Sequence, residues 1–214
     1  MAAPSPFRNA LYLITDRRQL TGGATLPETV EQALAGGVRL IQLREKDLPA
    51  AELWPLAQQL RSLTRRFSAK LFINDRIDLA LACGADGVHL GGHSLPTAEV
   101  RRLIGPRRLI GVSTHCLDDV ARAAGQGADF LTFGPVYPTP SKAAYGPPQG
   151  LDLLKQASRQ TALPVLALGG IKTSHVQAVM SHGASGIALI SAVLSDADPR
   201  AAARRFSELL SQQR

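Results

Sequence analysis

The sequence predicts a single (β/α)8 barrel, the TIM barrel fold. Two observations support this prediction: short apolar runs recur eight times, and segments with amphipathic helical periodicity lie between them. The runs lack apolar–polar alternation, as expected for parallel strands that are buried on both faces. We place the strands at residues 11–15, 39–43, 70–74, 87–90, 109–112, 130–133, 165–168 and 186–190.

Helices are expected between the strands at residues 51–67, 77–83, 97–103, 117–126 and 173–182. Glycine steps such as Gly36-Gly37 and Gly127-Ala128 end helices and mark the start of the next strand. An open doubly wound sheet is the alternative, and a glycine-rich dinucleotide fingerprint after the first strand would favour it. Thr15-Asp16-Arg17 stands there instead, so the barrel is the better prediction.

Length and composition agree with one domain spanning residues 1–214. We expect residues 1–9 to form a flexible N-terminal extension. No stretch has the length of a signal peptide core or a membrane span, so we expect a cytoplasmic protein without a membrane partner. Cys83 and Cys116 lack metal-type spacing and are expected to be free thiols.

The net charge of +7 suits an anionic ligand, yet the arginine pairs are scattered over predicted helices. Aromatic residues make up only 5% of the chain, and no basic stripe is interleaved with them. Nucleic acid is therefore not expected as a partner. The expected partners are phosphorylated small molecules, and the sequence leaves a homo-oligomer open.

A polar cluster follows the second predicted strand. Alternation along the strand points part of the cluster into the barrel mouth, where Arg44 could hold a diphosphate through its fork and Lys46 as a point charge. A solvated loop is the alternative. The cluster consists of Gln42, Leu43, Arg44, Glu45 and Lys46.

Further polar residues follow the third, fourth and fifth strands. Asn74 and Asp75 offer oxygen atoms of the kind that magnesium prefers, although Asp75 could instead cap the helix that begins at residue 77. Ser113 and His115 follow the fifth strand, where a hydroxyl can hold a polar ligand group; local hydrogen bonding is the alternative for His115.

Phosphate chemistry is expected in the last three loops. The long segment 134–150 contains Lys142, which could reach a phosphate, and connections of this length are usually functional. Gly169-Gly170-Ile171 and Ile190-Ser191-Ala192 follow the seventh and eighth strands, where barrels of this kind build phosphate sites from backbone N–H groups.

Six motifs occur in order along the chain. They are Leu11-Tyr12-Leu13-Ile14-Thr15-Asp16, residues 42–46, Asn74-Asp75-Arg76, residues 84–90, Gly134-Pro135-Val136-Tyr137-Pro138-Thr139 and Gly169-Gly170-Ile171. No single motif is specific, but their ordered set is. Through this set the chain resembles the thiamine phosphate synthase family from residue 11 to residue 191.

The resemblance implies a barrel that joins an aminopyrimidine, carried as a diphosphate ester, to a thiazole phosphate, with release of pyrophosphate. It implies that Arg44, Lys142 and Ser113 are catalytic and that Asp75 ligates Mg2+. The pyrimidine diphosphate would be bound by Gln42, Leu43, Arg44, Glu45, Lys46, Asn74, Ser113 and Lys142. The thiazole phosphate would be bound by Thr139, Pro140, Ser141, Gly170, Ile190 and Ser191.

One position departs from the family pattern, because Ser94 stands where a second magnesium-binding aspartate is expected. A hydroxyl is a weaker magnesium ligand than a carboxylate. Relatives of the thiazole tautomerase type also lose that aspartate, but they carry a histidine where this chain has Pro135. A tautomerase, a non-catalytic barrel that binds thiamine precursors, and an unrelated isomerase barrel are the alternatives.

Overall fold

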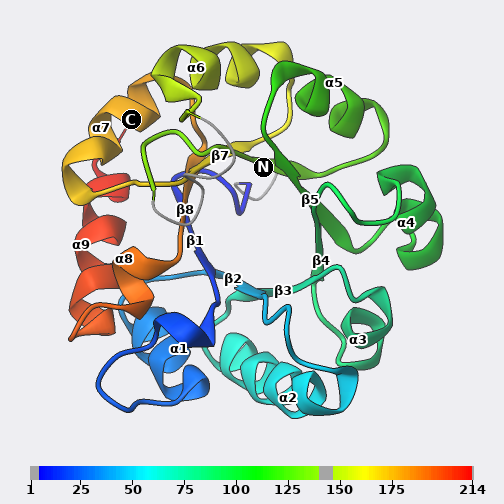
Figure 1. Cartoon of the computed structure of the whole chain (residues 1–214), viewed down its shortest axis with the longest axis vertical. Coiled ribbons are helices and arrows are strands. Elements are labelled where there is room, and N and C mark those ends of the chain that lie inside the picture. The colour runs from blue at the N-terminus through cyan, green and yellow to red at the C-terminus, as the bar shows by residue number, and fades with distance from the viewer. Residues whose placement is uncertain (1–4, 140–146, 214) are drawn as a thin grey trace.

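The protein is a closed barrel of eight parallel strands in chain order, surrounded by helices (Figure 1). This computed structural model describes residues 5–139 and 147–213. The predicted (β/α)8 fold is confirmed. The strands are β1 (Ala10–Ile14), β2 (Leu40–Leu43), β3 (Lys70–Asn74), β4 (Gly87–Leu90), β5 (Leu109–Thr114), β6 (Phe130–Phe133), β7 (Val165–Leu168) and β8 (Gly186–Leu189).

The predicted strands agree with these bounds to within two residues. The largest difference is at β5, which continues to Thr114 because Ser113 and Thr114 pair with Thr132 and Phe133 of β6. Polar residues at the end of a strand do not continue the apolar pattern that predicts the strand, although here they still pair with the neighbouring strand. Ser113 is therefore part of the barrel wall.

Helices cover the outside of the barrel, and every predicted helix is found. The predicted segment 173–182 divides into a short 3-10 helix and an α-helix. The helical elements are η1 (Arg17–Gln19), α1 (Leu26–Ala35), α2 (Ala50–Arg66), α3 (Ile77–Ala82), α4 (Thr97–Ile104), α5 (Leu117–Gly125), α6 (Gly150–Gln160), η3 (Thr173–His175), α7 (Val176–Ser181), α8 (Ser191–Leu194) and α9 (Pro199–Ser211).

Helices α1, α6, α8 and α9 were not predicted, although α1 carries a clear start signal in its sequence. The Thr25 side chain accepts from the Glu28 backbone, and the Glu28 side chain accepts from the Thr25 backbone, which forms a capping box. Buried Val30, Ala33 and Leu34 then follow at helical spacing. The motif Thr-x-x-Glu ahead of an apolar stripe would have located this helix.

Apolar side chains form two clusters, because successive residues of a strand point to opposite faces. The larger cluster fills the space between the strands and the helices. The smaller one fills the barrel interior and includes Tyr12, Leu40, Phe72 and Phe130. The interior is therefore packed, and ligands can enter only at the ends of the barrel.

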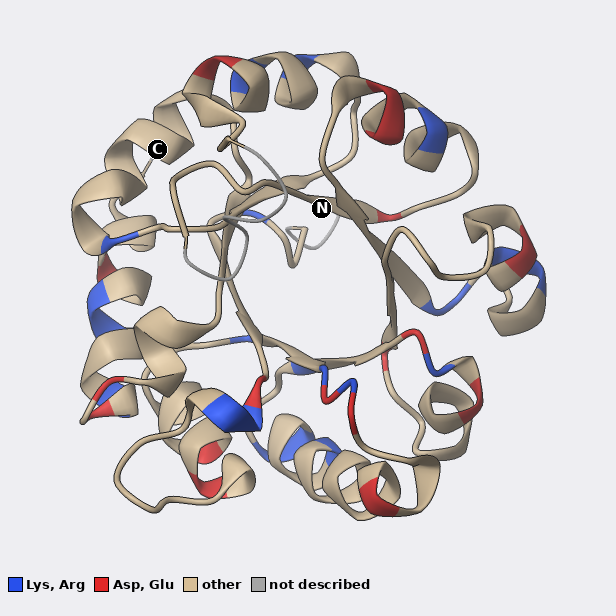
Figure 2. Ribbon diagram, in the orientation of Figure 1, with Lys and Arg blue, Asp and Glu red and all other residues tan. Residues whose placement is uncertain are grey.

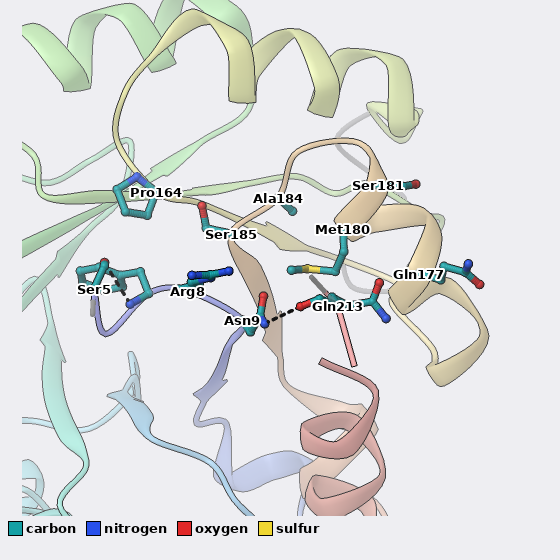
Figure 3. A pocket seen from close by; sticks show the side chains of 11 residues that line it. Ser5, Arg8, Asn9, Pro164, Gln177, Met180, Ser181, Ala184, Ser185 and Gln213 are labelled. Atoms are coloured by element: carbon teal, nitrogen blue, oxygen red, sulfur yellow. Dashed lines mark hydrogen bonds between the residues drawn. The ribbon is translucent and has the colours of Figure 1, made fainter. Parts of the chain in front are cut away.

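The amino-terminal end of the barrel is closed by both ends of the chain. Phe7 is buried and stacks on Phe130 with ring centroids 4.5 Å apart, so the expectation of a flexible extension is wrong at this residue. Asn9 Nδ2 donates to the carbonyl of Gln213 at 3.0 Å (Figure 3). A cavity of about 500 Å³ opens beside them, lined by Arg8 and Met180 among others. Cys83 and Cys116 are free thiols, as predicted.

Within the described residues no helix is long and apolar enough to cross a lipid bilayer.

Candidate active site

The loops that follow the strands differ in charge around the barrel mouth. Figure 2 shows charged residues on the segments after β1, β2 and β3, while those directly after β6 and β8 are uncharged. Residues 44–47, which follow β2, are Arg, Glu, Lys and Asp in turn. Charged residues are therefore concentrated on the β1 to β3 side of the mouth, while Lys172, after β7, is a cation on the other side.

Alternation along β2 decides which side chains of the predicted cluster face the interior. Leu43 lies in the cluster between strands and helices, so its side chain is structural. Leu40 lies in the interior, which places Gln42 and Arg44 on the inward face. Of the five residues predicted here, Gln42, Arg44 and Lys46 remain with side chains that can serve a ligand.

The carboxylate of Glu45 is buried and holds the start of this loop. Glu45 Oε1 accepts from the Thr15 hydroxyl at 2.6 Å, and Glu45 Oε2 accepts from the backbone N–H of Arg17 at 3.0 Å. Thr15 Oγ1 in turn accepts from the Arg44 backbone N–H at 2.9 Å. Arg17 also makes a two-pronged ion pair with Asp47 at 2.8 Å. Glu45 is therefore placed to fix Arg44.

We expect Glu45→Gln to lower both stability and turnover. The amide cannot accept from both partners, and one buried contact is lost at a cost of about 1–3 kcal/mol. Urea unfolding and steady-state kinetics measure the two effects, with Glu99→Gln on exposed α4 as the matched control. Unchanged stability with a raised KM would instead mean that the carboxylate contacts substrate directly.

Arg44 and Lys46 supply the positive charge of the mouth. Arg44 is half-buried and Lys46 is exposed, and neither takes part in an ion pair among the described residues. Arg44 is close enough to the interior that its charge helps to lower the pKa of His89. A cation without a carboxylate partner, beside a water-poor interior, is suited to an anionic ligand.

Asp75 directly follows β3 and has a left-handed backbone conformation, with φ 57°. Its carboxylate accepts from Asn74 Nδ2 at 2.8 Å and from the hydroxyl of Ser94. The alternative role for Asp75 is wrong: helix α3 has Arg76 at its N-cap position and no side-chain cap. The carboxylate is therefore available for a ligand, and Ser94 does lie beside it.

A chain of hydrogen bonds crosses the barrel interior beneath these loops. Gln42 Nε2 donates to the Tyr12 hydroxyl at 3.0 Å, and that hydroxyl contacts His89 Nδ1 at 3.1 Å. His89 Nε2 contacts Ser113 Oγ at 3.0 Å. Two residues predicted to bind ligand, Gln42 and Ser113, are thus connected through Tyr12 and His89.

His89 is 2% exposed, and burial together with the charge of Arg44 lowers its pKa to about 3. An unfolded histidine titrates near about 6.5. Between these values the unfolded chain binds the proton and the folded chain does not. The imidazole is therefore uncharged at neutral pH.

This difference predicts that the free energy of unfolding falls as the pH is lowered from about 6.5 towards about 3. Urea unfolding at a series of pH values measures the slope for the wild-type protein and for His89→Gln. The variant keeps the other titrating groups but loses this one, so we expect a shallower slope. Equal slopes would contradict the lowered pKa.

A cavity of about 640 Å³ lies on the β6 to β8 side of the mouth. It is bounded by the loops after β6, β7 and β8, and its lining includes Thr139, Gly170, Ile190 and Ser191, four of the residues expected to bind one ligand. Three further lining residues, Gln19, His115 and Lys172, were not assigned to this ligand site from the sequence. Helix α8 begins at Ser191, which places backbone N–H groups at the cavity wall.

Close backbone packing shapes this cavity. Tyr137 N–H donates to the Gly169 carbonyl at 3.0 Å, which joins the loops after β6 and β7. Gly170 has φ 65°, and a Cβ there would lie 2.5 Å from the Pro138 carbonyl oxygen. Glycine is therefore required at position 170.

His115 Nδ1 contacts the Gly134 carbonyl at 2.5 Å, which confirms that this histidine is bonded locally.

Three predicted residues, Pro140, Ser141 and Lys142, lie outside the described residues. The segment's two ends are joined, because Gln149 N–H donates to the Pro135 carbonyl at 2.7 Å. Pro135 lines the cavity, so Gln149 is held next to a cavity residue, and the role of Lys142 stays a prediction.

Tyr12 and His89 were not predicted as site residues, although their strands carry a signal. Each is a polar residue at an inward position of a strand that is otherwise buried and apolar. Such a position needs a hydrogen-bond partner, so a second polar residue facing it could have been sought.

The fold and the site together define a barrel enzyme with a charged side and a glycine-walled pocket at the carboxyl ends of its strands. The family pattern described as "Thiamine monophosphate synthase" matches residues 11–193. The chain belongs to this family, whose members named thiamine-phosphate synthase are transferases.

Relatives cover almost the whole chain. A protein of Geobacter sulfurreducens is 58% identical over 94% of both chains. The thiamine-phosphate synthase of Roseiflexus sp. is 44% identical over 97% of this chain and 89% of its own. A solved structure, thiamine phosphate pyrophosphorylase from Pyrococcus furiosus, has a TM-score of 0.87 and 37% identity, covering 96% of this chain and 98% of its own.

Proposed function

We propose that the protein joins 4-amino-2-methyl-5-(diphosphooxymethyl)pyrimidine to 4-methyl-5-(2-phosphooxyethyl)thiazole, giving thiamine phosphate and pyrophosphate. The observation that carries this proposal is the two-part mouth: Arg44 and Lys46, which have no ion-pair partner among the described residues, follow β2 on one side, and a glycine-walled pocket after β6 to β8 lies on the other. Two phosphorylated substrates need two such places at once. Cytoplasmic location and oligomeric state stay predictions.

Magnesium is proposed as the cofactor, held by Asp75 with Ser94 beside it. Asp75, Ser94 and Asn74 offer only oxygen atoms, the ligand type that this cation takes. The described residues contain no group of three His, Cys, Asp or Glu side chains placed to hold a metal. Magnesium does not need one, since it is usually bound by one or two carboxylates, waters and substrate phosphates. When bound, it would supply positive charge to the diphosphate.

In the proposed reaction the bond between the pyrimidinylmethyl carbon and the diphosphate oxygen breaks, and the electron pair leaves with pyrophosphate. The thiazole nitrogen then gives its lone pair to that carbon, forming the new carbon–nitrogen bond. Arg44, Lys46 and Lys142 would neutralise charge that develops on the leaving group. Ser113 would contact the pyrimidine, and Leu43 and Glu45 would shape the loop rather than touch it.

The pocket after β6 to β8 would hold the thiazole phosphate. Backbone N–H groups at Gly170 and at the start of α8 can donate to phosphate oxygens without a charged side chain. Thr139, Pro140, Ser141, Ile190 and Ser191 would complete this pocket. The thiazole ring would then be presented towards the charged side, where the pyrimidine is attacked.

A thiazole tautomerase is the second candidate, supported only by Ser94 at the second aspartate position. A tautomerase has no diphosphate leaving group to bind, so it would give Arg44 and Lys46 no role. A non-catalytic binding protein would likewise need no place for a leaving group.

Substrate omission separates these candidates. We expect thiamine phosphate only when both phosphorylated precursors and magnesium are present, and none when either precursor is left out. Conversion of a thiazole phosphate tautomer without the pyrimidine would establish the tautomerase. Binding of both precursors without any product would establish the binding protein, and either result would overturn the proposal.

A further inference from the structure

Counting hydrogens along the buried chain fixes the direction of each hydrogen bond. Gln42 Nε2 donates to the Tyr12 oxygen, so the single hydrogen of Tyr12 is left for His89 Nδ1. His89 is 2% exposed and its ring nitrogens contact only hydroxyl groups, with no carboxylate to balance a charge, so the imidazole is neutral and carries one ring hydrogen. With Nδ1 accepting, that hydrogen must be on Nε2, which then donates to Ser113 Oγ.

The two ends of the chain are left with opposite hydrogen-bonding roles. Ser113 Oγ also accepts from the Thr132 hydroxyl at 3.4 Å, so its own hydrogen is available to a ligand. Gln42 gives one amide N–H to Tyr12, so its carbonyl oxygen is left as the acceptor at this end, next to the second N–H of the amide. In the described part of the chain, buried side-chain polar atoms without a partner are confined to Arg61 Nε and Ser158 Oγ, and Gln42 is 1% exposed.

We propose that Tyr12 and His89 are positioning residues that fix Ser113 as a donor and Gln42 as an acceptor, and so make the site select an aminopyrimidine over its oxo counterpart. The inference rests on the proposed function, because it concerns how the pyrimidine is recognised. Neither residue needs to touch the substrate. Both act through the hydrogen-bond direction of the residues at the two ends of the chain.

The chemistry of the ligand edge gives the reason for this selectivity. An aminopyrimidine presents a ring nitrogen that accepts, next to an amino group that donates. That edge matches a donating Ser113 and an accepting Gln42. The oxo counterpart presents a ring N–H and a carbonyl, so donor would meet donor and acceptor would meet acceptor. A site built on hydrogen bonds rejects such a mismatch strongly.

The series of hydrogen bonds from Gln42 to Ser113 can adapt to the oxo ligand only if every bond reverses its donor and acceptor. Gln42 would have to turn its amide, the ring hydrogen of His89 would have to move to Nδ1, and Ser113 would have to donate inwards. Tyr12 links these changes, because its one hydroxyl must serve Gln42 and His89 together. Without that hydroxyl each end could turn separately.

The surroundings of His89 preserve its position. Tyr12 is fully buried, and its ring lies edge-on to Phe72 with centroids 5.7 Å apart. Gly111 leaves the space beside the imidazole: a Cβ there would lie 2.6 Å from His89 Nδ1 and 2.3 Å from a ring atom of Phe130. Packing therefore holds the imidazole against Tyr12 with little freedom to turn.

Specificity kinetics test the proposal in the whole protein. We compare kcat/KM for the aminopyrimidine diphosphate with that for its oxo analogue. The wild-type preference should be at least about a thousandfold and should fall to about tenfold in Tyr12→Phe, which removes only the hydroxyl. His89→Leu should lose the preference in the same way. In His89→Gln the new amide can still accept from Tyr12 and donate to Ser113, so this variant should keep the preference for the aminopyrimidine.

These outcomes separate positioning from a merely structural role. A structural role predicts that Tyr12→Phe lowers kcat/KM for both pyrimidines by the same factor, and an unchanged preference would overturn the proposal. If the wild-type protein makes no thiamine phosphate at all, the proposed function fails instead.

A second measurement decides the hydrogen-bond direction without any activity. NMR of isotope-labelled histidine nitrogens distinguishes the two neutral tautomers, and His89→Gln identifies the signal. We expect the hydrogen on Nε2 of His89 in the wild-type protein. A hydrogen on Nδ1 would reverse every bond of the chain and overturn the proposal.

Discussion

Replacing Arg44 with alanine will lower kcat/KM by about a hundred- to a thousandfold, the cost typical of removing one donor to developing negative charge. Arg44 follows β2 on the inward face, its backbone is held through Thr15 and Glu45, and no carboxylate neutralises it among the described residues. Its charge is thus available to the departing diphosphate. Steady-state kinetics with both precursors measure the loss.

Two further variants make this prediction specific. Arg44→Lys keeps the charge and loses the fork, so we expect activity between those of wild type and alanine. Arg102→Ala is the matched control, since Arg102 lies exposed on α4 and pairs with Glu99. Arg44→Ala activity within about twofold of the Arg102→Ala control would mean that the leaving group is bound elsewhere.

Replacing Asp75 with asparagine will raise the magnesium concentration for half-maximal activity by at least about tenfold. The carboxylate lies beside Ser94 and is not used as a helix cap, so it is the ligand with most charge in this part of the mouth. Loss of that charge weakens the hold on a hard cation. A magnesium titration of turnover measures the shift.

The opposite change at the neighbouring position should have the opposite effect. Ser94→Asp adds a second carboxylate next to Asp75, so less magnesium should be needed for half-maximal activity. Asp78→Asn is the control, because Asp78 lies on α3 and forms an ion pair with Arg76. Direct Mn2+ binding gives a readout apart from activity. Curves that do not move in either variant would contradict a metal at Asp75.

The barrel could be predicted from the sequence because each strand is a continuous apolar run and each helix has an apolar stripe. These patterns are local, so strand and helix bounds follow to within about two residues. The burial of Phe7 was not predicted, because Phe7 is a single aromatic residue outside any apolar run. Only its stacking on Phe130 shows that it closes the barrel. No local pattern encodes that contact.

The candidate site was predictable where residues follow strands and not where they meet across the barrel. Gln42, Asp75, Gly170 and Ser191 lie at the ends of different strands, which parallel topology brings to one end of the barrel. The bonds of the Glu45 carboxylate to Thr15 and Arg17 could not be predicted, because they depend on the tertiary fold.

The link from Tyr12 to His89 spans 77 residues of chain, so periodicity could not reveal it. A polar residue on an inward strand position shows that some partner exists. Which partner it is depends on the strand register, which pairs His89 of β4 with Asn74 and Gly111 on its two sides.

The central claim is that one mouth brings two phosphorylated substrates together and releases pyrophosphate. Phosphorus NMR of a single reaction with both precursors and magnesium tests it most directly, since every phosphorylated species is seen at once. The account predicts that pyrophosphate and thiamine phosphate appear in equal amounts as both precursors disappear. Inorganic phosphate in place of pyrophosphate, or loss of one precursor without the other, would contradict it.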